Sequence, residues 1–330
     1  SDIRGPLFVE AMEMQARGIE VLRLNTGNPA TFGFGLPDSI AQALVGQEEK
    51  GVGYCDFKGM PQAREAICAY EQKKGIQGIT PEDIFIGNGV SEVVSFALMP
   101  LLNPGDEVLV PTPSYSLWGN SVYLASGKAV FYVCDEKAHW YPDIADIRSR
   151  ITDRTRAIVL INPNNPTGLL IDPDLLLRIL EKAGKLGILL ILDECFLDFT
   201  GQEERSLISY IKETKNLFIL KSFTKMYAMP GLRLGYGISS NRELLVRMEA
   251  AGQCWGVSVP ASAAGIAALG EREYKQRAVR LVKEERAYLK AELEAAGMQV
   301  WDGQADYLFF RAPGMCDLYE RLLPWGILIR

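Results

Sequence analysis

The chain has 330 residues, of which 48% are hydrophobic and 23% charged, and its formal net charge is −6 at pH 7. This length predicts about two domains with a substantial buried core, and the acidic balance argues against binding to a nucleic-acid backbone. Because the first residues are charged and the longest apolar runs are short, the sequence predicts neither a signal peptide nor a membrane span, and we place the protein in the cytoplasm.

The cysteine and histidine content disfavours two further classes of site. Six cysteines are spread along the chain without C-x-x-C spacing, and His139 is the single histidine. We therefore expect neither a zinc site nor a disulfide framework. A hydrolase with a histidine general base is also disfavoured, because His139 would have to serve as that base.

The N-terminal segment is predicted to consist of short elements joined by a long loop. A helix over 7–18 ends at Gly18, and a short strand follows at 21–24. A loop rich in Gly, Pro and Asn then leads to a helix over 39–48, which Asp38 can cap.

From about residue 60 to residue 220, the hydrophobic pattern alternates between helices and short buried strands. It predicts helices over 61–74, 93–102, 115–126, 143–151 and 174–186, and strands over 83–86, 107–111, 129–134, 157–162, 188–194 and 217–220. Such alternation is typical of a parallel sheet covered on both faces. We expect a three-layer α/β fold with a doubly wound, mainly parallel sheet.

After residue 237 the predicted strands become fewer. Helices are expected over 242–251, 261–269 and 273–296, followed by strands at 298–301 and 306–311, a helix over 317–323 and a strand over 325–330. We divide the chain into an N-terminal arm with part of a small domain (1–45), a large domain (46–240) and a C-terminal small α+β domain (241–330) that we expect to be incomplete at its end.

A glycine-rich turn between a strand and a helix forms a candidate anion site. In the sequence GNGVSE, the backbone amides of Gly89, Val90 and Ser91 would point out of a helix N-terminus, where the helix dipole favours an anion. Asn88 or Ser91 can add a side-chain donor. Such a turn is weak evidence when it stands alone.

The sequence SFTKMYAMPGLRLGYG sets one lysine among small and cationic residues. Lys225 follows Ser222 by three positions and precedes Arg233 by eight. We expect Gly231 and Gly235 to loosen the backbone, so that hydroxyl, amine and guanidinium can converge on a phosphate ester. Taken alone, a Ser-x-x-Lys is more often a solvated lysine in a loop.

Four further candidates lie at the ends of predicted elements. Asp193 ends a buried strand, Asn165 lies in the polar turn NPNNPTG, Tyr115 begins a helix and Tyr54 lies between two helices. Three of them have an ordinary structural alternative: a helix cap or salt bridge for Asp193, a self-capped turn for Asn165 and loop packing for Tyr115. Their joint occurrence favours a shared site.

Together these motifs resemble a known family. Tyr54, GNGVSE, Tyr115, NPNNPTG, Asp193 and SFTKxxxxPGLRLG occur in the order and spacing of the fold type I pyridoxal-phosphate enzymes, the aspartate-aminotransferase superfamily of classes I and II. The first half of the chain is most similar to alanine-type aminotransferases. The second half is most similar to threonine-phosphate decarboxylase and histidinol-phosphate aminotransferase, so a natural mosaic and a constructed chimera are both open.

The resemblance implies a pyridoxal 5′-phosphate cofactor and a role for each candidate. Lys225 would carry the cofactor covalently and move the substrate proton, and Asp193 would pair with the pyridine nitrogen. Tyr115 would stack on the ring, and Asn165 would donate to its phenolic oxygen. The phosphate would be held by Gly89, Val90, Ser91, Ser222, Arg233 and a Tyr54 contributed by the partner subunit, which implies a homodimer with shared active sites.

Two departures from the family pattern concern the substrate. Phe196 stands where aminotransferases usually have a tyrosine, so that Asn165 would hold the phenolic oxygen alone. The arginine that clamps the substrate carboxylate would lie beyond Arg330, and the chain does not begin with Met, so we expect an incomplete chain. Arg4, Asn28 and Arg330 are named as candidate substrate contacts.

The resulting functional prediction is an aminotransferase that exchanges an amino group between an alanine- or glutamate-like amino acid and a 2-oxo acid. The alternative is a decarboxylase of an O-phosphorylated amino acid, or an aminotransferase of the histidinol-phosphate type. A third class, a non-enzymatic protein that retains the fold, is disfavoured by the presence of Lys225, Asp193 and Arg233 together. Small molecules and a second copy of the chain are the expected partners, with no metal, nucleic acid or membrane.

Overall fold

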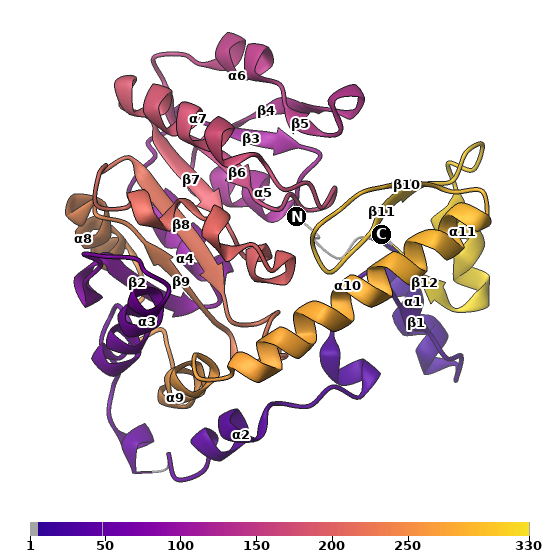
Figure 1. The fold of residues 1–330 in the computed structure, drawn as a ribbon, viewed down its shortest axis with the longest axis horizontal. Helices are drawn as coiled ribbons and strands as arrows, with labels where there is room; N and C mark the ends of the chain where they lie inside the picture. The colour runs from indigo at the N-terminus through magenta and orange to yellow at the C-terminus, as the bar shows by residue number, and fades with distance from the viewer. Residues whose placement is uncertain (1–5, 48, 330) are drawn as a thin grey trace.

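A computed structural model describes residues 6–47 and 49–329 (Figure 1). Its centre is an eight-stranded sheet in the order β2-β9-β8-β7-β6-β3-β4-β5. The strands are β2 (Ile84–Asn88), β3 (Glu107–Thr112), β4 (Lys128–Asp135), β5 (Tyr141–Pro142), β6 (Thr155–Ile161), β7 (Leu189–Asp193), β8 (Leu217–Ser222) and β9 (Leu234–Ile238). Only β9 and the two-residue β5 run antiparallel to their neighbours. The predicted mainly parallel α/β fold is confirmed.

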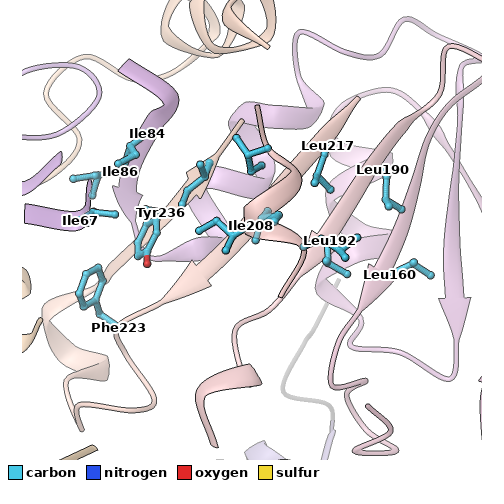
Figure 2. Close-up of a cluster of buried hydrophobic side chains, with 14 of the residues drawn as sticks. Ile67, Ile84, Ile86, Leu160, Leu190, Leu192, Ile208, Leu217, Phe223 and Tyr236 are labelled. Atoms are coloured by element: carbon cyan, nitrogen blue, oxygen red, sulfur yellow. The ribbon is translucent and has the colours of Figure 1, made fainter. Parts of the chain in front are cut away.

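Helices cover both faces of this sheet. They are α3 (Pro61–Lys73), α4 (Val90–Leu98), α5 (Leu117–Leu124), α6 (Ile144–Arg150), α7 (Pro173–Lys185), α8 (Arg242–Ala251) and α9 (Val259–Ala268). Alternate strand residues point to opposite faces. In β7, Leu190 and Leu192 pack in one buried cluster with α3, α6, α7 and α9 (Figure 2), and Ile191 packs in a second with α4, α5 and α8.

Strand β9 was not predicted, and its glycines explain why. The expectation that Gly235 loosens the backbone is wrong, because Gly235 is a buried strand residue paired with Ser222. A Cβ atom on Gly235 would lie 2.7 Å from the amide nitrogen of Val90, and one on Gly237 would collide with the ring of Phe218. Glycine here permits close approach, although its presence weakens a strand pattern.

The remaining elements lie beside the sheet. They are α1 (Pro6–Ala16), β1 (Leu22–Arg23), α2 (Asp38–Leu44), α10 (Arg272–Ala295), β10 (Gln299–Trp301), β11 (Phe309–Arg311), α11 (Leu318–Leu322) and β12 (Ile327–Leu328). Strand β1 pairs in parallel with β12, and β10 pairs antiparallel with β11, as the expected strand pair. The predicted cap at Asp38 is wrong, because Pro37 occupies the cap position and Asp38 is already helical. The three-domain division stays a prediction.

Short 3-10 helices occupy several connections. They are η1 (Pro29–Phe32), η2 (Lys50–Val52), η3 (Pro81–Asp83), η4 (Glu136–Ala138), η5 (Leu197–Thr200), η6 (Glu203–Arg205), η7 (Leu207–Tyr210), η8 (Pro230–Leu232) and η9 (Leu323–Trp325). Among the described residues, no helix combines the length and apolar character needed to cross a membrane.

The β10–β11 hairpin and helix α10 are fastened to the large sheet. Arg311 forms two hydrogen bonds of 2.9 Å with the carboxylate of Glu136. Trp140, which follows β4, meets Trp301 of β10 edge-on, with ring centroids 5.4 Å apart. The amine of Lys275 in α10 lies 2.8 Å from Asp198. In Figure 1, α10 runs from near α9 toward β10 and β11.

Candidate active site

The candidate residues gather at one edge of the sheet, where parallel strands end. Asp193 pairs in register with Ile161 of β6 and Leu220 of β8, and the amide of Asn162 donates to the carbonyl of Asp193 at 2.8 Å. Carboxyl ends of parallel strands are where ligands bind in such folds. The structure therefore brings Asp193, the turn after β6 and the loop after β8 to the same edge.

Asp193 is held by two donors. The indole Nε1 of Trp118 donates to its Oδ2 at 3.1 Å, and the amide of Cys195 donates to its Oδ1 at 3.2 Å. Burial raises the pKa of Asp193, and these hydrogen bonds oppose that shift. A buried carboxylate with a raised pKa favours a positively charged neighbour. The role of Trp118 was missed in the sequence, where its place one helical turn after Tyr115 is the only signal.

The turn between β2 and α4 lies against Arg233. Gly89 has φ +79°, and a Cβ atom there would collide with the Arg233 guanidinium, so the arginine lies directly against this turn. Val90 and Ser91 are the first two residues of α4, whose amides have no acceptor within the helix. The amide of Asn88 is already bonded to Oε2 of Glu92 at 2.6 Å, and the amide of Gly89, which was expected to bind the anion, donates to the carbonyl of Gly87 at 2.8 Å. The amides of Val90 and Ser91 and the Arg233 guanidinium remain as donors for an anion.

Lys225 lies in the loop after β8, as predicted, and is half-buried. Among the described residues it forms no ion pair, whereas Lys221 is paired with Glu194 at 2.7 Å. The hydroxyl of Ser222 is 2.8 Å from that of Thr224, a second hydroxyl that the sequence reading missed. The loop therefore offers one uncommitted amine beside two hydroxyl groups.

In the NPNNPTG turn, two of the three asparagines stabilise the turn itself. Asn162 Oδ1 accepts from the amide of Ile171 at 2.8 Å, and Asn164 Oδ1 accepts from Thr167. Asn165 is half-buried, as is Tyr115, which lies two residues before α5. The structure places both at the same edge, and their individual roles stay predictions.

The connection between β10 and β11 covers this edge. The hydroxyl of Tyr307 donates to the carbonyl of Asn164 at 2.8 Å, and the Tyr307 ring meets Phe196 edge-on at 5.1 Å. Asp306 is exposed as a residue, yet the protein around its carboxyl displaces water and raises its pKa to about 6, with Lys225 and Arg286 acting in the opposite direction. An acidic group thus lies near Lys225, which the sequence reading did not find.

Two candidates, Tyr54 and Asn28, lie at exposed positions. Tyr54 is 83% exposed and stacks on Trp255, with ring centroids 4.3 Å apart. Asn28 is exposed at the start of η1. Arg4 and Arg330 fall outside the described residues. Within the described ranges, no cluster of His, Cys, Asp or Glu has the arrangement of a metal site, and the six cysteines are free.

Comparison with known proteins relates the whole arrangement to one family. The model of the family described as "Aminotransferase class I and II" matches residues 19–324. The chain is 44% identical to glutamate-pyruvate aminotransferase AlaA of Escherichia coli (strain K12) over 237 residues, 71% of this chain and 58% of that relative. It thus spans less than two thirds of that relative's length.

Two further likenesses cover more of the chain. Histidinol-phosphate aminotransferase of Ruminiclostridium cellulolyticum is 29% identical over 271 residues, which is 82% of this chain and 72% of that relative. A crystal structure of an aminotransferase from Escherichia coli matches 99% of this chain and 86% of its own, with a TM-score of 0.87 and 35% identity.

Proposed function

Because this chain belongs to the family of class I and II aminotransferases, we propose that it uses pyridoxal 5′-phosphate to exchange an amino group between an alanine- or glutamate-like amino acid and a 2-oxo acid. One observation carries the proposal: the half-buried Asp193 ends β7, and Lys225, which forms no ion pair among the described residues, follows the neighbouring strand β8 at the same edge of the sheet. The name of the relative that is 44% identical supports this substrate pair.

The residues present fit this cofactor. Gly89 leaves room for the Arg233 guanidinium against the first turn of α4, which is the arrangement a phosphate needs. The pKa of Asp193 is raised because its carboxylate is removed from water. The positive charge of a protonated ring nitrogen would offset this loss of hydration. Ser222, Arg233 and the amides of Val90 and Ser91 would hold the phosphate.

The chain's own residues divide the chemistry between them. When bound, the cofactor supplies a ring that withdraws the electron pair left on the substrate Cα. Lys225 Nζ would serve as the base that moves the proton of the substrate Cα. Asp193 would pair by charge with the protonated ring nitrogen, and Trp118 donates a hydrogen bond that holds Asp193 in place. Tyr115 would orient the ring, Asn165 would bind its phenolic oxygen, and the Tyr307 connection would limit access of water.

We extend the proposal to a homodimer. Tyr54 is exposed in the single chain and lies in an aromatic patch with Trp255 and Phe57, which a partner subunit would cover. In that assembly Tyr54 would reach the phosphate of the neighbouring site. The substrate contacts proposed at Arg4, Asn28 and Arg330 remain part of the same proposal.

The test is to locate the covalently bound cofactor. The protein is loaded with pyridoxal 5′-phosphate, reduced with borohydride and digested with a protease. The labelled peptide is then identified by mass spectrometry. We expect the pyridoxyl group on Lys225 and its loss in Lys225→Ala. A label on Lys221 would contradict the assignment, because the Lys221 amine is engaged in an ion pair with Glu194.

The reaction type is tested with the same preparation. With alanine and 2-oxoglutarate we expect pyruvate and glutamate in equal amounts. O-phosphothreonine is the matched probe for the decarboxylase alternative, and carbon dioxide released from it, without pyruvate formation from alanine, would overturn the transamination proposal.

A further inference from the structure

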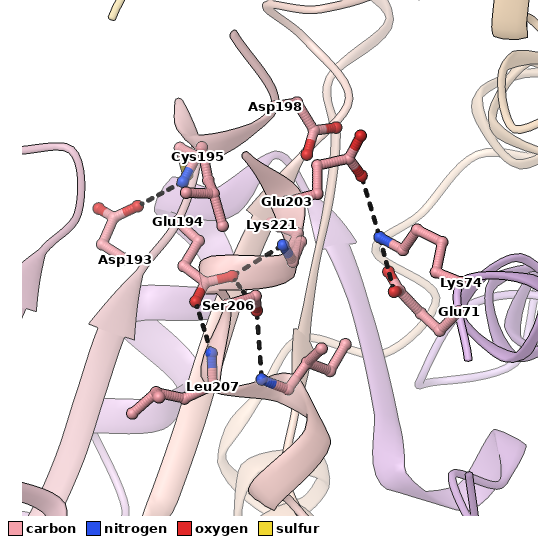
Figure 3. Close-up of polar contacts among 12 residues, drawn as sticks. Glu71, Lys74, Asp193, Glu194, Cys195, Asp198, Glu203, Ser206, Leu207 and Lys221 are labelled. Atoms are coloured by element: carbon pink, nitrogen blue, oxygen red, sulfur yellow. Dashed lines mark hydrogen bonds and ion pairs between the residues drawn. The ribbon is translucent and has the colours of Figure 1, made fainter. Parts of the chain in front are cut away.

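Two neighbouring strands end at residues of the proposed cofactor site, and the residues adjacent to those two ends form an ion pair. Asp193 ends β7 and Ser222 ends β8, and both strands run in parallel with Asp193 beside Leu220. Glu194 follows Asp193, and Lys221 precedes Ser222. Because side chains alternate across a strand, Lys221 and Glu194 lie on the opposite face from Ser222 and Asp193. In Figure 3 a dashed line joins Glu194 and Lys221, which lie to the right of Asp193 in that view.

The geometry of this pair is tightly determined. Lys221 Nζ lies 2.7 Å from Glu194 Oε2, and the two side chains are 6% and 0% exposed. The Ser206 hydroxyl donates to Glu194 Oε2 at 2.6 Å, and the amide of Leu207 donates to Oε1 at 3.3 Å. Each carboxylate oxygen of Glu194 therefore has a hydrogen-bond donor, and Lys221 meets this carboxylate as an ion pair without a hydrogen bond of regular geometry.

The positive charge of Lys221 is maintained by its surroundings. Burial alone would lower the pKa of Lys221, but the negative charges of Glu194, Asp198 and Glu71 raise it well above its usual value. Breaking such a pair is costly, whereas a well-packed apolar pair of similar volume often gives equal or greater stability. Stability alone therefore does not account for a buried ion pair between these two strand ends.

We propose that Lys221 and Glu194 are positioning residues that fix the separation between Asp193 and Ser222, the two ends that grip the cofactor. The inference rests on the proposed function. Pyridoxal 5′-phosphate is a rigid ligand held at its ring nitrogen and its phosphate, so its affinity depends on that separation. Inorganic phosphate would contact only the phosphate-binding end, so its affinity does not depend on the separation between Asp193 and Ser222.

The experiment compares these two ligands in the double variant Lys221→Met/Glu194→Met, which replaces the ion pair by an apolar pair. We measure the release of pyridoxal 5′-phosphate from the loaded protein, the binding of inorganic phosphate to the unloaded protein by calorimetry, and the melting temperature of both. We expect pyridoxal 5′-phosphate affinity to fall about tenfold or more, as misplacement of gripping groups by a fraction of an ångström does. Phosphate affinity should change less than about twofold by the same reasoning.

Two further variants serve as controls. Lys221→Arg keeps the charge and a donor for Glu194, and we expect it to retain most of the cofactor affinity. Lys212→Met breaks the ion pair with buried Asp83, next to the first residue of β2 at the opposite edge of the sheet. It should lower the melting temperature and leave cofactor release unchanged.

The outcomes separate the readings. Unchanged cofactor affinity in the double variant, or equal losses for both ligands in step with a fall in melting temperature, would overturn the positioning role. If the double variant does not fold, Glu194→Asp decides, because it keeps the charge and shortens the side chain that meets Lys221. Wild-type melting with cofactor release at least about threefold faster supports the proposal, and unchanged release overturns it. If wild-type protein takes up no cofactor on Lys225, the proposed function fails, and this inference fails with it.

Discussion

At the residue scale, the behaviour of Asp193 depends on a side chain outside the recognised motifs. Trp118 is 1% exposed and donates its indole hydrogen to the carboxylate that would face the ring nitrogen. The sequence predicted Asp193 and Lys225 because both follow buried strands. It could not predict Trp118, because a buried tryptophan in a helix usually serves packing, and only the three-dimensional structure joins α5 to β7.

We predict that Trp118→Phe slows turnover with little change in KM. The variant keeps an aromatic ring and removes a hydrogen bond to a charged group, worth about 1.5–3 kcal/mol, or about 10- to 100-fold in kcat. Tyr132→Phe is the matched control, because it removes a buried hydrogen bond of 2.8 Å to the Val159 carbonyl elsewhere in the sheet. Equal effects of the two variants on kcat would show that Trp118 acts only through stability.

A second prediction concerns pH and Asp306. Its pKa is raised to about 6, so the folded protein favours the protonated carboxyl more than the unfolded chain does. This stabilising contribution is complete below about pH 4, near the ordinary aspartate pKa, and is lost as the pH rises through about 6. In cofactor-free protein, the melting temperature of Asp306→Asn minus that of wild type should therefore rise between these pH values.

The control for Asp306 lies in the same connection. Asp302→Asn changes an exposed carboxylate that pairs with Lys290. A flat difference for Asp306→Asn across the range, or the same slope in both variants, would refute the shift at Asp306.

At the scale of elements, the sequence failed to predict the strand and the connection that depend on close contacts between backbones. Most strands and helices from 61 to 222 were predicted within about two residues of their observed bounds, because each has one clear hydrophobic period. The exceptions are the two-residue β5, which was not predicted, and α4, which begins three residues and ends four residues before the predicted helix. Strand β9 and the docking of the β10–β11 connection were not predicted, since both depend on glycines that meet distant backbone. Gly168 has φ +71°, and a Cβ atom there would lie 2.7 Å from the Cα of Gly303.

We predict that Gly168→Ala lifts this connection from the NPNNPTG turn. It adds a steric clash to the backbone cost of a left-handed alanine, and overpacking typically costs about 1–3 kcal/mol beyond that cost. Gly187→Ala is the control, because Gly187 has φ +68° with no atom within 4 Å of the added Cβ. Gly168→Ala should melt lower than Gly187→Ala and lose more activity. Equal melting temperatures would mean that the connection tolerates the methyl group.

At the scale of the whole molecule, the exposed aromatic patch of Tyr54, Phe57 and Trp255 is the surface that we propose a partner subunit covers in the homodimer. The three side chains are 83%, 38% and 47% exposed in the single chain. The sequence indicated Tyr54 through a family resemblance alone. Neither its neighbours Phe57 and Trp255 nor the stacking of the rings follows from a local pattern, because Trp255 is about 200 residues away along the chain.

The shared site is tested by complementation. We expect Tyr54→Arg, which would obstruct the neighbouring site, and Lys225→Ala to be inactive separately. After subunit exchange, half of the dimers carry one site with neither lesion, so activity should recover toward about a quarter of wild type, as the two-fold symmetry of an isologous dimer requires. Proven exchange without recovery would show that Tyr54 serves its own subunit.

The edge-on pair of Trp140 and Trp301 also has an optical consequence. The two indoles belong to different parts of the chain, one following β4 of the large sheet and the other in β10, and their centroids are 5.4 Å apart. At such a separation their ultraviolet transitions couple, and the coupling decays steeply as the rings move apart. The circular dichroism of the unlabelled protein therefore contains a signal that reports directly how closely the hairpin sits on the sheet.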